Sequence, residues 1–207
     1  MLEALRHKDA CTERYGYTEE TYIETVKLVA GIAQDFSVKK GSFLQHVGTP
    51  AQHIFILTKG VMRAGFISPN GEDVTVRFYT EGYRAFTSDL FFSTSHLPAK
   101  CFLVAETNVE GFTAKTSVLE EMALQHPVIN DYRMKLLEYQ VKFGPDFDVM
   151  KAVASAEEKL VEFREEYPGL EERISAKVLA SYLRITPQYL SKLLKPEKHH
   201  EDDVVGE

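Results

Sequence analysis

The spacing of hydrophobic residues changes twice along the chain. They recur at helical intervals over residues 18–32, alternate with polar residues in short runs over residues 35–115, and return to helical spacing after residue 117. Glycine and proline clusters separate the short runs. Because alternate side chains of a strand face opposite sides, many short alternating runs predict an antiparallel sandwich or barrel. The pattern as a whole predicts an α+β protein.

The strongest local signal in the strand region is Pro69-Asn70-Gly71, which lies between runs at residues 66–68 and 73–79. An Asn-Gly pair tolerates the positive φ angles of a tight turn. This segment therefore predicts a β-hairpin.

A long helix is predicted after the strands. Ser117 and Glu120 have the spacing of a capping box, and Pro127 opens the longer helix that follows. The apolar residues of that helix recur at 3-4-3-4 spacing, which is typical of a seam between paired helices. They are Ile129, Tyr132, Leu136, Tyr139 and Phe143. We expect a dimer through this seam, the alternative being that the helix packs on the barrel of its own chain.

Residues 175–195 have the pattern of two short helices joined by a tight turn. Thr186 has a side chain suited to an N-cap, and Pro187 occupies the first helical position, where its missing N–H costs nothing. A second capping box, at Ser155 and Glu158, opens the helix that precedes this segment.

The second of these two helices has a polar, cationic face opposite its leucines. That face comprises Gln188, Tyr189, Ser191, Lys192 and Lys195. A short exposed helix with such a face is typical of a helix-turn-helix that reads the major groove of DNA. The alternative is an ordinary helical hairpin that closes a domain, and Arg184 stands in the turn where glycine is usual.

The composition is that of a globular protein, with 44% hydrophobic and 27% charged residues among 207. No apolar run reaches membrane-spanning length, and the first ten residues are too polar for a secretory signal. Cys11 and Cys101 lie far apart without a C-x-x-C spacing, which indicates a reducing compartment. We therefore expect a cytoplasmic protein with no membrane partner.

The net charge of −7 argues against a protein that coats nucleic acid non-specifically. The charge is unevenly distributed, because residues 171–196 carry five basic and two acidic side chains, whereas residues 197–207 carry five acidic side chains and one lysine. The predicted helix-turn-helix is thus locally basic, and we expect the acidic tail behind it to be disordered.

Motifs typical of catalysis are absent from the sequence. It contains no G-x-S-x-G, H-E-x-x-H, P-loop or glycine-rich dinucleotide turn. The barrel also lacks the paired H-x-H ligands of a cupin-type metal enzyme. We expect no enzyme activity, no metal and no cofactor.

The order of helix, barrel, long helix and two-helix segment resembles the Crp/Fnr family of bacterial transcription regulators, whose sensor is a cyclic-nucleotide-binding-type β-roll. Local marks of the resemblance are Lys40-Gly41, Asn70-Gly71-Glu72, and residues 154–159 followed by 179–183. The resemblance covers nearly the whole chain.

It implies an antiparallel β-roll with a long dimerisation helix and a C-terminal helix-turn-helix domain. We expect helices and sensor at residues 1–126, the dimerisation helix and hinge at 127–154, the DNA-binding domain at 155–196 and the tail at 197–207.

In such regulators the recognition helix reads bases from positions near its start and one turn later, here Pro187, Gln188 and Lys192. Gln188 can pair with an adenine edge, and Lys192 with guanine or a phosphate. Thr186, Tyr189, Ser191 and Lys195 complete the expected DNA-binding set. Proline cannot replace a basic reader, and no strand pattern for a wing follows the helix.

The resemblance implies double-stranded DNA with an inverted repeat and a second copy of the chain as partners. An unknown small-molecule effector and RNA polymerase are further partners we consider.

Cyclic-nucleotide binders of this fold hold the ribose with a glutamate and the cyclic phosphate with an arginine. The corresponding positions fall near Thr87 and residues 98–100, where Thr87 cannot replace a carboxylate and Lys100 offers only a point charge. The roll is therefore expected to bind a different ligand or none. Candidate effector-binding residues are Arg84, Thr87, Ser88 and Lys100.

Two functions follow from the sequence. The favoured one is a dimeric DNA-binding transcription regulator with a β-roll sensor. The alternative is a ligand-binding or interaction protein of the same fold whose helix-turn-helix no longer binds DNA.

Cyclic AMP is expected not to bind tightly, because its phosphate would lie uncompensated inside an apolar roll. Titration calorimetry of the full chain with cyclic AMP should show no saturable heat at micromolar concentrations. A micromolar dissociation constant would overturn this expectation.

Overall fold

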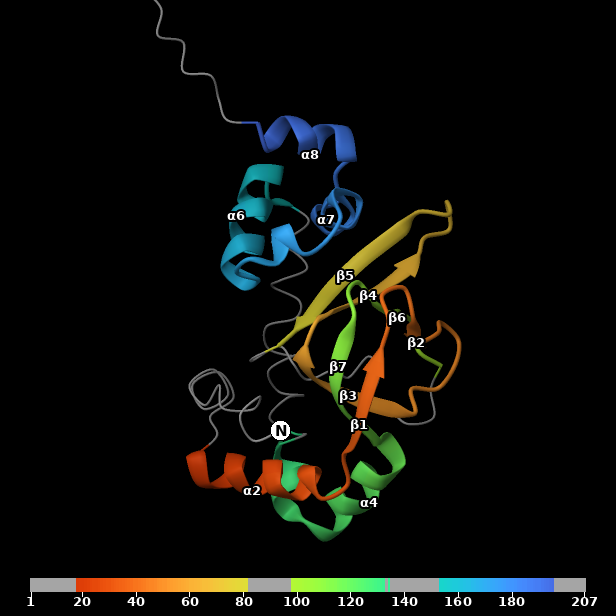
Figure 1. Ribbon diagram of the computed structural model, residues 1–207, viewed down its shortest axis with the longest axis vertical. Coiled ribbons are helices and arrows are strands. Elements are labelled where there is room, and N and C mark those ends of the chain that lie inside the picture. Colours follow the sequence, from red (N-terminus) through yellow and green to blue (C-terminus); the bar gives the residue numbers. More distant parts are fainter. Residues whose placement is uncertain (1–17, 82–97, 133, 135–152, 196–207) are drawn as a thin grey trace, which may run out of the picture.

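The structure is a computed structural model that describes residues 18–81, 98–132, 134 and 153–195. A β-roll lies between two groups of helices, with α2 and α4 at one end and α6, α7 and α8 at the other (Figure 1). The helices are α2 (Glu19–Ala30), α4 (Thr116–Gln125), α6 (Ala156–Glu166), α7 (Ala176–Leu183) and α8 (Pro187–Leu193), with a short 3-10 helix, η1 (Leu170–Glu172), before α7. The predicted α+β architecture is confirmed.

The roll consists of two antiparallel sheets, with strand orders β1-β7-β3 and β2-β6-β4-β5. The strands are β1 (Gln34–Val38), β2 (Phe43–Gln45), β3 (His53–Lys59), β4 (Val61–Ile67), β5 (Asp73–Thr80), β6 (Phe102–Ala105) and β7 (Val109–Lys115). These strands lie within residues 34–115, which agrees with the strands that the sequence pattern predicts over residues 35–115.

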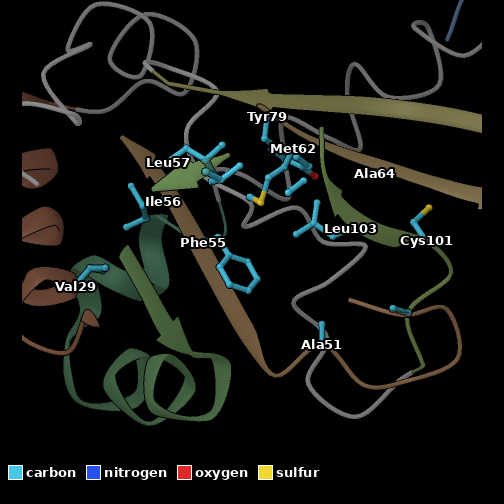
Figure 2. Packing of buried hydrophobic residues seen from close by; sticks show 13 residues of the cluster. Val29, Ala51, Phe55, Ile56, Leu57, Met62, Ala64, Tyr79, Cys101 and Leu103 are labelled. Atoms are coloured by element: carbon cyan, nitrogen blue, oxygen red, sulfur yellow. The ribbon is translucent and has the colours of Figure 1, made fainter. Parts of the chain in front are cut away.

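The core of the roll lies between the two sheets (Figure 2). Ile56, Leu57, Met62 and Leu103 are at most 2% exposed there. Gly111 on β7 permits close pairing with β3, because a Cβ at this position would collide with the carbonyl oxygen of Ile56. None of the described helices is long and apolar enough to cross a membrane.

The predicted hairpin joins β4 to β5. The Gly71 N–H donates to the carbonyl oxygen of Ser68 at 2.9 Å, and Gly71 takes a φ of 82°. Glycine adopts this conformation without steric cost, so Gly71 and not Asn70 provides the turn.

The capping-box prediction is confirmed at Ser155 and wrong at Ser117. Ser155 accepts from the Glu158 N–H at 3.1 Å, and the Glu158 carboxylate accepts from the Ser155 N–H at 2.7 Å. At the other position, β7 runs directly into α4, which begins at Thr116 without a side-chain cap. Ser117 therefore lies inside the first turn.

The helix predicted from Pro127 is present over residues 127–132 and 134. Most of the expected dimer seam, with Leu136, Tyr139 and Phe143, lies outside the described residues, as does the expected break at residues 144–145.

Arg184, in the turn between α7 and α8, adopts a left-handed conformation with φ 60° and ψ 42°. The Ile185 N–H donates to the Ala180 carbonyl oxygen at 3.0 Å and closes the end of α7. The Arg184 guanidinium lies 6.0 Å from the centre of the Phe66 ring on β4. Arg184 thus occupies the position where glycine is favoured, and its side chain reaches the roll.

Replacing Arg184 with glycine or alanine removes the same contact with Phe66 but leaves different backbones. A left-handed conformation is costly for a residue with a Cβ. We therefore expect the free energy of unfolding of Arg184→Gly to be about 1 kcal/mol higher than that of Arg184→Ala. Urea denaturation followed by circular dichroism measures the difference. Equal stability of the two variants would contradict a left-handed residue at this turn.

Candidate nucleic-acid interface

The outer side of α8 is polar and exposed. Thr186 accepts a hydrogen bond from the Tyr189 N–H at 3.2 Å and begins the helix, and Leu190 is fully buried. The exposed side chains of Gln188, Ser191 and Lys192 lie on the opposite side at i, i+3 and i+4, and exposed Lys195 follows the end of the helix. We call these four residues the reading face. All five of these predicted residues are exposed, and Thr186 is also the cap of α8.

Tyr189, the remaining predicted residue, is 44% exposed, and its hydroxyl is engaged by a carboxylate. The hydroxyl donates to Glu157 Oε1 of α6 at 3.2 Å, and this hydrogen bond and the negative charge raise the pKa of Tyr189. The sequence pattern did not indicate Glu157 as a neighbour of the reading face. The only sequence signal was its place in the first turn of a capped helix.

The helices α6 to α8 with η1, residues 156–193, form what we call the C-terminal module. Its helix α7 rests on the edge strand β5 (Figure 1). Ser181 Oγ accepts a hydrogen bond from the Thr75 N–H at 2.8 Å and donates one to the Asp73 carbonyl oxygen at 2.6 Å. The module is thus attached through α7, while the reading face of α8 stays exposed.

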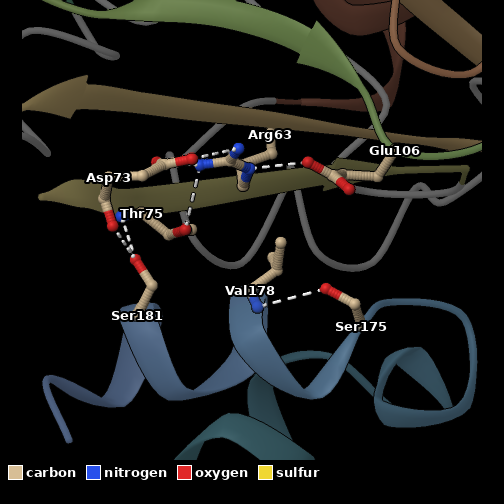
Figure 3. A network of polar contacts seen from close by, with 7 residues as sticks. All are labelled: Arg63, Asp73, Thr75, Glu106, Ser175, Val178 and Ser181. Carbon is tan, nitrogen blue, oxygen red and sulfur yellow. Dashed lines mark hydrogen bonds and ion pairs between the residues drawn. The ribbon is translucent and has the colours of Figure 1, made fainter. Parts of the chain in front are cut away.

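A buried arginine lies next to this contact (Figure 3). The Arg63 side chain is 7% exposed, and its Nε donates to Glu106 at 2.6 Å. Its two terminal nitrogens donate to the Asp73 carboxylate at 2.6 and 3.0 Å, and one also to Thr75 at 3.2 Å. Burial lowers the pKa of Arg63, but the hydrogen bonds and charges of Asp73 and Glu106 outweigh burial and raise the pKa above its usual range.

This arginine network was also missed from the sequence, although Arg63 is the one charged residue in the run Val61–Ile67. Its guanidinium also lies 5.0 Å from the centre of the Phe102 ring. Within the described part of the chain, no buried side-chain nitrogen or oxygen lacks a hydrogen-bond partner. All three guanidinium nitrogens of Arg63 are therefore engaged by side chains of the roll.

The expected effector residues are mostly outside the described part of the chain. Arg84, Thr87 and Ser88 fall there, and Lys100 is an exposed residue just before β6. Among the residues that the structure describes, no group of three histidine, cysteine or acidic side chains is arranged to hold a metal ion.

The described part of the expected dimer seam is only its beginning. Ile129 is 3% exposed within a single chain, so it packs on its own protomer, and Tyr132 is half-buried. Of the two described seam residues, Ile129 is therefore not available to a partner chain.

Comparison with solved structures shows the fold, whereas two other comparisons find nothing. No protein-family model matches the sequence, and a search of curated proteins returns no match. Among solved structures, FixK2 from Bradyrhizobium japonicum has a TM-score of 0.67 and 18% identity, over 79% of this chain and 83% of that one. CLP from Xanthomonas campestris, a c-di-GMP responsive global regulator, has a TM-score of 0.60 and 13% identity, over 83% and 89%.

A third structure is described as a transcriptional regulator of the Crp/Fnr family from Eubacterium rectale. It has a TM-score of 0.62 and 11% identity, over 90% of this chain and 85% of that one. With sequence identities this low, the TM-scores show a shared fold and nothing more. The chain thus has the fold of Crp/Fnr transcription regulators, a cyclic-nucleotide-binding-type β-roll followed by a helix-turn-helix.

Proposed function

We propose that this chain is a homodimeric, DNA-binding transcription regulator of the Crp/Fnr type. The observation that carries the proposal is the reading face, a polar and cationic surface on a capped helix that faces away from the roll. Selection of bound duplexes from random DNA at moderate salt tests it directly, since a sequence-specific regulator enriches one motif.

The geometry of the reading face supports base recognition. Gln188 and Lys192 lie one helical turn apart on the exposed side of α8, while Leu190 anchors the helix from beneath. A glutamine can pair with the edge of adenine, and a lysine with guanine or a phosphate. Tyr189, Ser191 and Lys195 are assigned to phosphates, and Thr186 to the start of the same surface.

A second candidate function is an interaction protein whose helix-turn-helix no longer binds DNA. The carboxylate of Glu157 favours this second function, because the carboxylate lies within hydrogen-bond distance of Tyr189, beside the reading face, and repels phosphates. Pro187 in place of a basic reader and the acidic composition of residues 197–207 point the same way.

We further propose that the roll is a sensor for a ligand other than cyclic AMP, with Arg84, Thr87, Ser88 and Lys100 as the residues to vary first. The protein would act in the cytoplasm, and RNA polymerase would be its further partner. Cyclic di-GMP is a suitable second ligand to test, because CLP is described as responsive to it.

Lys192→Ala distinguishes base reading from phosphate contact. If Lys192 reads guanine, we expect a loss of about 1–3 kcal/mol of binding free energy concentrated at one base pair. If it contacts phosphate, affinity should fall evenly across sequences and the salt slope by roughly one. Fluorescence anisotropy with the selected duplex and its single-base variants, at several salt concentrations, measures both.

Gln188→Ala serves as the comparison, because it removes no charge and should relax preference at one adenine only.

Deleting residues 197–207 removes a net charge of −4, so binding should tighten most at low salt. If neither the full chain nor the shortened chain binds any duplex above background at low salt, the second candidate function is correct.

Leu136→Asp should convert a dimer into a monomer in light scattering, because it places a charge in the apolar seam. Leu124→Asp is the matched control, since Leu124 is 89% exposed on α4 and should leave the dimer intact. In a two-fold dimer the recognition helices should face successive major grooves about 34 Å apart. A Leu136→Asp chain that stays dimeric with unchanged affinity would rule out this seam.

A further inference from the structure

The hydrophobic core of the C-terminal module is completed by the roll. Val61 of β4 and Phe78 of β5 are fully buried, and both belong to the cluster that includes Phe163, Leu179 and Leu190. The remaining members of that cluster come from the module itself. Separating the two parts would therefore expose the module's interior.

Aromatic rings form the centre of this shared core. The Phe78 ring centre lies 6.0 Å from that of Phe163, 5.5 Å from Tyr167 and 5.3 Å from Tyr182. The Phe78 N–H also donates to the Tyr167 hydroxyl at 3.4 Å. The rings meet mainly edge to face or tilted, an arrangement that depends on relative orientation as well as on burial.

Polar contacts hold the C-terminal half of α7 and the chain that leads into the helix. Ser181 supplies partners for the Thr75 N–H and the Asp73 carbonyl on the edge of β5. In the segment before α7, Arg173 Nη2 donates to both carboxylate oxygens of Glu81, at 2.9 and 3.0 Å. A swing of the module would break both sets of contacts.

The Asp73 residue ties these contacts to the interior polar network. Its carbonyl oxygen accepts a hydrogen bond from Ser181, and its carboxylate accepts one from Arg63 (Figure 3). Arg63 also donates to Glu106, near the end of β6. Val178 of α7 points toward this network in the same view. The underside of α7 is therefore fitted to one position on the sheet.

We infer that the contact between the module and β4–β5 is a fixed joint, and that the chain binds DNA without a small-molecule effector. The inference rests on the proposed function. Gln188, Ser191, Lys192 and Lys195 are already exposed in the docked arrangement, so no effector-driven rotation is needed to uncover them. Ligand binding in the roll would then regulate something other than the exposure of α8.

The first experiment measures the joint without reference to DNA. Spin labels are placed at Asp35→Cys on β1 and Glu165→Cys on α6, both exposed, in a full chain whose own cysteines are alanine. Dilution with unlabelled chain isolates distances within one protomer. Pulsed electron resonance should show one narrow distance distribution, which Phe78→Ala or the milder Ser181→Ala broadens. Two distances in the unaltered joint would overturn the fixed joint.

The second experiment measures effector independence. The chain is unfolded in guanidinium, freed of small molecules by gel filtration, refolded and tested on the selected duplex. We expect its dissociation constant to match that of the untreated protein, and the label distance to stay unchanged when the duplex is added. A loss of about tenfold or more in affinity, or a shifted distance, would overturn the inference.

Ser181→Ala shows whether docking of the module favours or opposes DNA binding. Ser37→Ala, at an exposed residue, is the control. If the mutation leaves the module correctly placed only about one third of the time, the dissociation constant rises about threefold. Tighter binding by Ser181→Ala would mean that docking inhibits DNA binding and would overturn the inference. If no form of the chain binds any duplex, the proposed function and effector-free DNA binding both fail, while the label distances still decide the joint.

Discussion

The placement of the C-terminal helices depends on the burial of one aromatic ring, Phe78. It projects from the sheet into a space lined by Phe163, Tyr167 and Tyr182, so α6 and α7 pack around a side chain from the roll. Leu190 carries this arrangement to α8, because it lies fully buried in the same cluster. The direction in which α8 presents its polar side is thus set by a residue more than one hundred positions away in the sequence.

The Arg63 network adds hydrogen bonds, which depend on direction, to this hydrophobic contact. Burying a guanidinium is costly, and the cost is offset only when its hydrogen bonds are well placed, as they are with Asp73, Glu106 and Thr75. In the Arg63–Glu106 pair, both side chains are at most 13% exposed, and losing one partner of such a buried pair typically costs about 3–5 kcal/mol. Because Asp73 also accepts from Ser181, the network fixes the backbone on which α7 rests.

Features that depend on neighbouring residues could be predicted from the sequence. The Thr186 cap, the Ser155 capping box and the glycine turn at Gly71 all act within four positions, so their patterns are readable. The polar side of α8 was predicted for the same reason, since helical geometry alone brings its residues together. The Ser117 prediction failed because α4 begins directly after β7, so the N-cap position falls on Lys115, whose side chain makes no capping hydrogen bond.

Contacts between distant parts of the chain could not be predicted. Arg63 pairs with Glu106 at a separation of 43 residues, and Ser181 with Asp73 at 108, and no periodic pattern records such pairings. Glu157 was overlooked beside Tyr189 because the two lie 32 residues apart on different helices. The sequence thus indicated which surface could bind, whereas the contacts that orient it emerged only from the packing.

The shared core also limits how this protein can be recombined with others. A helix-turn-helix with a closed core can be grafted onto a new sensor as a cassette. Here residues 153–195 would arrive with a hole where Phe78 and Val61 belong, and with Ser181 facing no strand edge. A workable chimera must carry the β4–β5 hairpin together with the helices, so the boundary for exchange runs through the roll and not between residues 134 and 153.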